Sequence, residues 1–161
     1  MSDGLWIQGA ADPDGECFGC GPQNTHGLQL RSLVQGDGVS ASWTAQPHHS
    51  ARPGLMCGGV IGTLLDCHTG AAVWWWVRQR HGQWPGDEVL PGDDPAPLYL
   101  TAGYDVTLLR PTPIGVVELH AEVMEHREPE LVVTGRLEAD GKPRANIVAR
   151  WRRFSRRPKP M

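Results

Sequence analysis

The sequence predicts an α+β domain in which one long helix packs against a roughly six-stranded, curved antiparallel sheet. Residues 58–80 carry apolar side chains at helical spacing, whereas the apolar period becomes two after residue 97. The connections between successive predicted strands are short, which favours antiparallel pairing. A chain of 161 residues and 17.6 kDa, with 40% hydrophobic residues, forms one domain with its own core, over residues 1–161.

The chain begins with a turn-rich segment, residues 1–27, that Pro, Gly and Asn interrupt. Residues 28–34 follow as the first predicted strand, and residues 39–43 alternate apolar and small polar side chains as the second. Gly36-Asp37-Gly38 between them is a hairpin turn signal. Residues 45–56 are predicted to form a loop that leads into the helix.

The helix over residues 58–80 is the strongest local prediction. Its apolar positions recur three and four residues apart, and Arg78 and Arg80 lie at its C-terminal end, where positive charge suits the helix dipole. Trp74, Trp75 and Trp76 cannot all face one side of a helix, because consecutive residues lie about 100° apart. We therefore expect at least one of them to contact the sheet, a ligand pocket or a partner protomer.

The second half of the chain supplies most of the predicted sheet. Residues 81–97 form an acidic excursion rich in Pro and Gly that should run over the surface. Four strands with alternating patterns follow, separated by short turns that contain Pro or Gly: 98–109, 115–126, 130–138 and 144–154.

Charge and hydropathy exclude several classes of function. Residues 1–149 hold 9 Lys and Arg against 18 Asp and Glu, which argues against a dedicated nucleic-acid surface. Basic residues gather at the end of the chain, and we expect residues 155–161 to form a basic tail, either a solvated end or a contact for ligand phosphates. The apolar run 71–77 is too short to span a bilayer, and the N-terminus lacks a signal-peptide pattern. We expect a cytoplasmic protein.

The four cysteines favour neither a disulfide framework nor a complete metal site. Cys17 and Cys20 form a single CxxC, and zinc would need two further ligands, from Cys57, Cys67 or histidines. We expect a reduced turn with two small buried thiols and no bound metal.

The beginning of the helix carries the chemistry. Gly58 and Gly59 leave its first amides sterically open, and a helix N-terminus has unsatisfied N–H donors and partial positive charge, which suit an oxyanion. Asp66 follows Gly59 by two helical turns among leucines, where an unpaired carboxylate is costly to bury. It acts in catalysis, lies on a solvated face of the helix, or pairs with a basic residue such as Arg78. His68 points away from Asp66, so we predict no Asp–His dyad.

Two stretches together resemble the hotdog-fold acyl-CoA thioesterases, in the branch that includes phenylacetyl-CoA-type enzymes. They are Cys17-x-x-Cys20-Gly21…Asn24…Gly27-Leu28 and His49…Pro53-Gly54-x-x-Cys57-Gly58-Gly59-Val60-Ile61-x-Thr63-Leu64-Leu65-Asp66. Thr101 and Arg110-Pro111 match later family positions, so the resemblance covers roughly residues 17–154. It implies a hotdog fold, a helix wrapped by a curved antiparallel sheet.

The resemblance also implies roles. The Gly59 amide, with Gly58, would hold the thioester carbonyl oxygen. Asp66 would act as general base or as attacking carboxylate, and Thr101 would place the water or the acyl group. Coenzyme A would enter as part of the substrate, with no other cofactor, and a homodimer or dimer of dimers would complete the site. Four residues are predicted to contact substrate, partly through its phosphates: His49, Cys57, Arg110 and Arg152.

The chain departs from the family at Cys57, where the family has His. Cys57 is a small filler, a thiol activated by the helix N-terminus, or a mark of lost or shifted activity. The hypothesis that follows is hydrolysis of acyl-CoA to the acid and coenzyme A. Its rivals are a non-catalytic acyl-CoA-binding protein and an enoyl-CoA hydratase or dehydratase, which usually pairs Asp with His.

Overall fold

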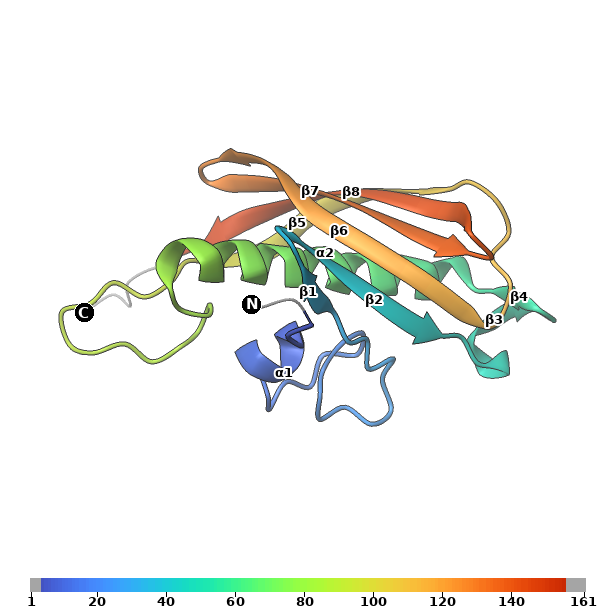
Figure 1. Ribbon diagram of the computed structural model, residues 1–161, viewed down its shortest axis with the longest axis horizontal. Helices are drawn as coiled ribbons and strands as arrows, with labels where there is room; N and C mark the ends of the chain where they lie inside the picture. Colours follow the sequence, from blue (N-terminus) through green and yellow to red (C-terminus); the bar gives the residue numbers. More distant parts are fainter. Residues whose placement is uncertain (1–3, 156–161) are drawn as a thin grey trace.

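The sheet is the frame of the molecule. A computed structural model describes residues 4–155, and Figure 1 shows the sheet curving around one long helix. Six strands lie in the order β1-β2-β6-β7-β8-β5, and each neighbouring pair is antiparallel. The strands are β1 (Leu33–Gln35), β2 (Gly38–Thr44), β5 (Leu98–Leu108), β6 (Val116–Arg127), β7 (Glu130–Ala139) and β8 (Lys142–Phe154). The predicted α+β architecture is confirmed.

The long helix α2 (Gly58–His81) fills the concave side of this sheet and contacts β2, β5, β6, β7 and β8. Leu64, Leu65 and Val73 are fully buried there. The helix ends at His81, and the left-handed conformation of its C-cap residue Gly82 (φ 69°) lets the Gly82 N–H reach the carbonyl of Arg78. The predicted helix is therefore confirmed to within one residue.

The predicted strand 28–34 is wrong over most of its length, because only Leu33–Gln35 pairs as β1. The amides of Leu28 and Leu30 donate instead to the carbonyls of Phe18 and Gly19, at 2.8 and 3.0 Å. The N-terminal segment thus takes the backbone partners that a strand would need. That segment also contains a short helix, α1 (Ile7–Ala11), which was not predicted.

Two short strands, β3 (Ser50–Arg52) and β4 (Leu55–Met56), form a small hairpin in the predicted loop before α2. It follows the 3₁₀ turn η1 (Pro47–His49). The predicted excursion after α2 is confirmed, since residues 82–97 contain no helix or strand and extend past the C-terminal end of α2 (Figure 1).

The three consecutive tryptophans of α2 point in different directions, as expected. The indole N–H of Trp75 donates to the carbonyl of Gly36, at 3.1 Å. The ring of Trp76 lies edge-on to Tyr99 of β5, 6.4 Å between centroids. Trp74 lines a cavity beside Asp66.

His68 is buried completely on the opposite side of α2 and takes no part in that cavity. Its Nδ1 lies 2.8 Å from the Ser32 hydroxyl, and its Nε2 lies 3.2 Å from the carbonyl oxygen of Val39. Burial lowers the pKa of His68 from 6.5 to about 3, so the ring is neutral in the folded protein.

We expect the neutral His68 to make the fold acid-sensitive. The unfolded chain binds a proton at this side chain below its ordinary pKa of 6.5 and the folded chain does not, so stability falls as the pH drops from 6.5 towards 3. Between about pH 7.5 and 5, the unfolding free energy of the wild type should fall by about 2 kcal/mol more than that of His68→Gln. Urea unfolding at both pH values measures this; equal losses would contradict it.

Candidate active site

Asp66 and Thr101 meet beside the middle of α2. Asp66 is half-buried on the helix, and the hydroxyl of Thr101, on β5, donates to its Oδ1 at 3.0 Å. Thr101 is in register with Trp151 of β8, whose indole donates to the Thr69 hydroxyl at 3.1 Å. The edge strand β5 and the helix thus hold the carboxylate in a fixed position.

This pair opens into a cavity of about 310 Å³ between α2, β5 and the N-terminal segment. Ala71, Trp74 and Trp151 give it apolar walls, and Cys17, Cys20 and Cys67 form another part of its lining. A carboxylate in an otherwise largely apolar hollow is typical of a small-molecule site. A larger hollow over β2, β6, β7 and β8 contains none of the predicted site residues.

The environment makes Asp66 a stronger base than an ordinary aspartate. Burial is the largest cause that raises the pKa of its carboxyl, and the hydrogen bond from Thr101 opposes this effect. A carboxylate that is more basic and held by one donor suits proton abstraction from water.

The amides of Gly58 and Gly59 lie at the first turn of α2, as predicted. The amides of Val60 and Ile61 donate to the carbonyl of Cys57, at 3.1 and 3.2 Å, and are the first donors within the helix. The amides of Gly58 and Gly59 precede them and are not used by the hydrogen bonds of the helix. Gly59 has open space around it, because an added Cβ would meet only the Cys57 sulfur, at 3.8 Å. An oxyanion could approach these donors.

Cys57 and His49 flank this end of the helix. Cys57 is the N-cap residue of α2, makes no side-chain cap hydrogen bond, and donates its amide to the carbonyl of His49 at 2.9 Å. The Nδ1 of His49 accepts a hydrogen bond from the Gln46 amide at 2.9 Å. Burial is the main cause that lowers the pKa of His49, and the neighbouring His48 lowers it further. Both residues therefore border the helix amides, two turns from Asp66.

The structure places the two predicted arginines away from the cavity. Arg152 is in register with Leu100 and Glu130, on the sheet face opposite Trp151, and its Nη1 lies 3.5 Å from the Glu130 carboxylate. Arg110 follows β5 and donates to the carbonyl of Pro143 at 2.9 Å. The end of the predicted basic tail, residues 156–161, lies outside the described residues.

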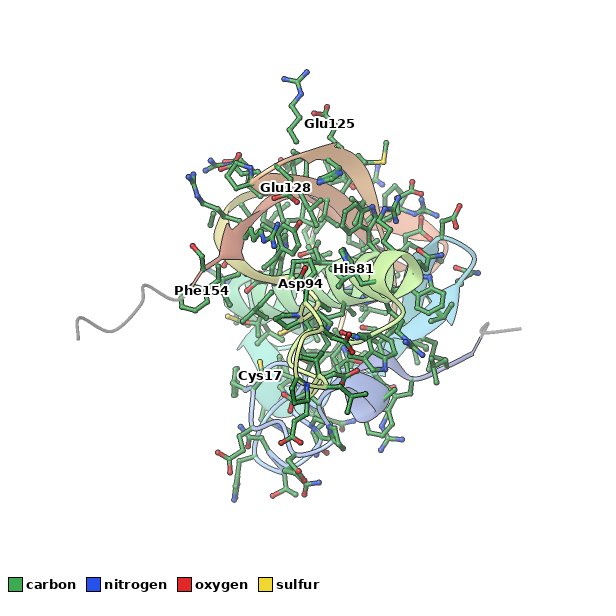
Figure 2. The ribbon with its side chains drawn as sticks, turned by 90° about the vertical axis from the view of Figure 1, so that its left-hand side faces the viewer. Cys17, His81, Asp94, Glu125, Glu128 and Phe154 are labelled. Carbon is green, nitrogen blue, oxygen red and sulfur yellow. The ribbon has the colours of Figure 1, made fainter. Side chains whose placement is uncertain are left out.

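Sequence analysis named Cys67 among the possible partners of the CxxC, but it did not predict the cysteine cluster on the cavity wall. Cys17 is exposed, so the prediction of two buried thiols is wrong, and Cys67 joins Cys17 and Cys20. Figure 2 shows Cys17 on the N-terminal segment beneath the long helix. The signal was the CxxC itself; only the fold shows which distant cysteine approaches it.

Solved structures share this fold. A thioesterase superfamily protein has a TM-score of 0.68 at 21% identity over 85% of this chain, and this chain spans only 60% of its length. A thioesterase superfamily protein from Shewanella loihica gives 0.58 at 26% identity, over 81% of this chain and 96% of its own. A phenylacetic acid degradation-related protein from Ralstonia eutropha gives 0.59 at 20%, over 78% and 85%.

These likenesses show the fold, a hotdog as seen in the thioesterase superfamily, and confirm the predicted resemblance at that level. No family model matches the chain. No curated protein matches it in sequence. Among residues 4–155, no helix has the length and apolar character needed to cross a bilayer.

Proposed function

We propose that this protein is a thioesterase that hydrolyses an acyl-CoA to the free acid and coenzyme A. The observation that carries the proposal is the Asp66 carboxylate, which Thr101 holds at 3.0 Å inside a partly apolar cavity. The cavity suits an acyl group, and the carboxylate suits activation of water. The fold is also that of the thioesterase superfamily, which supports the reaction class by analogy.

The reaction needs only groups that this chain supplies. Asp66 takes a proton from water as the water oxygen attacks the thioester carbon, and Thr101 positions the carboxylate. The carbonyl oxygen becomes an oxyanion that accepts hydrogen bonds from the amides of Gly59 and Gly58. Collapse of this intermediate breaks the C–S bond, and coenzyme A leaves as a thiolate that takes up a proton. An alternative first step has Asp66 itself attack the carbon.

A second copy of the chain completes the proposed site. Gly59 precedes Asp66 by seven residues on one helix, which is about 10 Å along its axis, too far for both to act on one thioester within one protomer. Tyr104 and Leu108 of β5 are in register with the buried Ala149 and Ala145, and so face the helix side of the sheet. They are nevertheless 47% and 56% exposed. A homodimer would cover them and bring Gly59 of one chain to Asp66 of the other.

The deciding experiment measures free thiol released from a series of acyl-CoAs, with equilibrium binding of the same compounds in parallel. Hydrolysis of at least one compound supports the proposal. Binding without any thiol release would instead support a non-catalytic acyl-CoA-binding protein, the interpretation that Cys57 in the family His position favours.

We predict that Cys57 is a filler and not the nucleophile. Serine suits the N-cap position that Cys57 occupies, so Cys57→Ser should fold. It should change kcat by less than about tenfold, and Cys57→His should be tolerated, because neither removes the attacking or basic group. Steady-state kinetics checks this. Loss of turnover in Cys57→Ser, with an acyl-enzyme trapped on the wild type in mass spectrometry, would establish a cysteine nucleophile.

A further inference from the structure

Three cysteines from distant parts of the sequence converge on one wall of the cavity. Cys17 and Cys20 lie in the N-terminal loop, and Cys67 lies on α2, next to Asp66. Their sulfur atoms all lie within 4.8 Å of one another, and those of Cys17 and Cys67 are 3.8 Å apart. None of the three forms a disulfide. The remaining cysteine, Cys57, is not part of this cluster.

The spacing of the sulfur atoms fits a tetrahedral zinc ion. With Zn–S bonds of about 2.3 Å, two thiolates of a tetrahedral site lie about 3.8 Å apart. The Cys17–Cys67 distance already has this value, so binding requires only small side-chain movements. A disulfide would require these two sulfurs to approach to about 2.05 Å.

The N-terminal loop is built closely around the cluster. Gly19 has no room for a side chain, because an added Cβ would lie 2.3 Å from the Cys67 sulfur. The amide of Gly21 donates to the carbonyl of Cys17 at 2.8 Å and closes the Cys-x-x-Cys turn. The turn therefore holds Cys17 and Cys20 against the Cys67 sulfur.

We propose that Cys17, Cys20 and Cys67 bind one Zn²⁺ ion as thiolates, with a water from the cavity as the fourth ligand. Cys17 is exposed and all three residues line the cavity, so the open coordination position faces it. Each thiol releases its proton to solvent on binding. The ion fastens the N-terminal loop to α2 one residue from Asp66. This replaces the expectation of no bound metal, and it does not depend on the proposed hydrolysis.

Metal binding is tested on the full-length, reduced protein without reference to activity. Elemental analysis after growth with zinc should give about one Zn²⁺ per chain. After chelation, titration with Co²⁺ should give sulfur-to-cobalt charge-transfer bands and the visible bands of tetrahedral cobalt, both reversed by excess Zn²⁺. Removal of zinc should lower the melting temperature, since a ligand that binds only the folded state stabilises it.

The cysteine variants separate a real site from adventitious thiol binding. Cys20→Ser and Cys67→Ser should each lose most of the cobalt signal, whereas Cys57→Ser, the matched control, should keep it. Sub-stoichiometric zinc in the wild type with no cobalt–thiolate bands would overturn the proposal even if the variants do not fold. An equal loss of the cobalt signal in Cys57→Ser would also overturn the proposal. So would a wild-type protein that forms a Cys17–Cys67 disulfide and still binds no metal after reduction.

Discussion

Asp66→Asn is expected to lower kcat for acyl-CoA hydrolysis by about 10²–10⁴ while acyl-CoA binding survives. Asparagine keeps the size of the side chain and can still accept the Thr101 hydrogen bond through its amide oxygen. It cannot take a proton from water or attack a carbon. Thiol-release kinetics and equilibrium titration with a substrate analogue measure the two quantities separately.

Asp94→Asn is the matched control, because Asp94 is exposed in the segment after α2 (Figure 2). Its kcat should equal that of the wild type.

A single turnover of the wild type in oxygen-18 water then distinguishes the two roles of Asp66. If Asp66 is a general base, oxygen-18 from water enters the released acid directly. If Asp66 is the nucleophile, it forms an acyl anhydride, and water that attacks the Asp66 carbonyl carbon of this anhydride leaves the label in Asp66. Undiminished kcat in Asp66→Asn would refute both roles.

The fold was predictable because its main elements have strong local patterns. Residues 98–154 alternate between the two sheet faces, and α2 begins at two glycines and ends near Arg80, so both signals survive in the sequence. The failure at residues 28–32 has a physical cause. Apolar side chains such as Leu30 are buried there although the segment is not a strand. Its backbone amides form hydrogen bonds with the N-terminal loop and not with a neighbouring strand of the sheet.

The site was predictable only in part, because its residues meet through the fold. The family resemblance assigned both Asp66 and Thr101 to the site, and in the structure a hydrogen bond joins them. Sequence spacing did not show that Cys67 lies beside Cys17, since fifty residues separate them and no periodicity links a loop to a helix. Arg152 was grouped with other basic residues by its position near the chain end, whereas strand alternation turns it away from the cavity.

Gly59→Pro is expected to lower kcat by about 10²–10³, because proline has no N–H to donate to the oxyanion. Proline is tolerated in the first turn of a helix, and Gly58 before it has no Cβ to clash with the ring. The space around Gly59 is also open. Circular dichroism, together with the mass in light scattering, verifies that the variant folds and assembles as the wild type does.

Gly59→Pro and Asp66→Asn together reveal whether the site spans two chains. The test uses a mixed dimer of one Gly59→Pro chain and one Asp66→Asn chain, purified through two different tags. If the site is shared, the intact Gly59 of the Asp66→Asn chain meets the intact Asp66 of the Gly59→Pro chain. That site should restore about half of the wild-type kcat per dimer, since the other site has lost both groups. If each site instead used Gly59 and Asp66 of one chain, both sites would keep a defect. The mixed dimer would then be as inactive as its parents, and the two-chain site would be wrong.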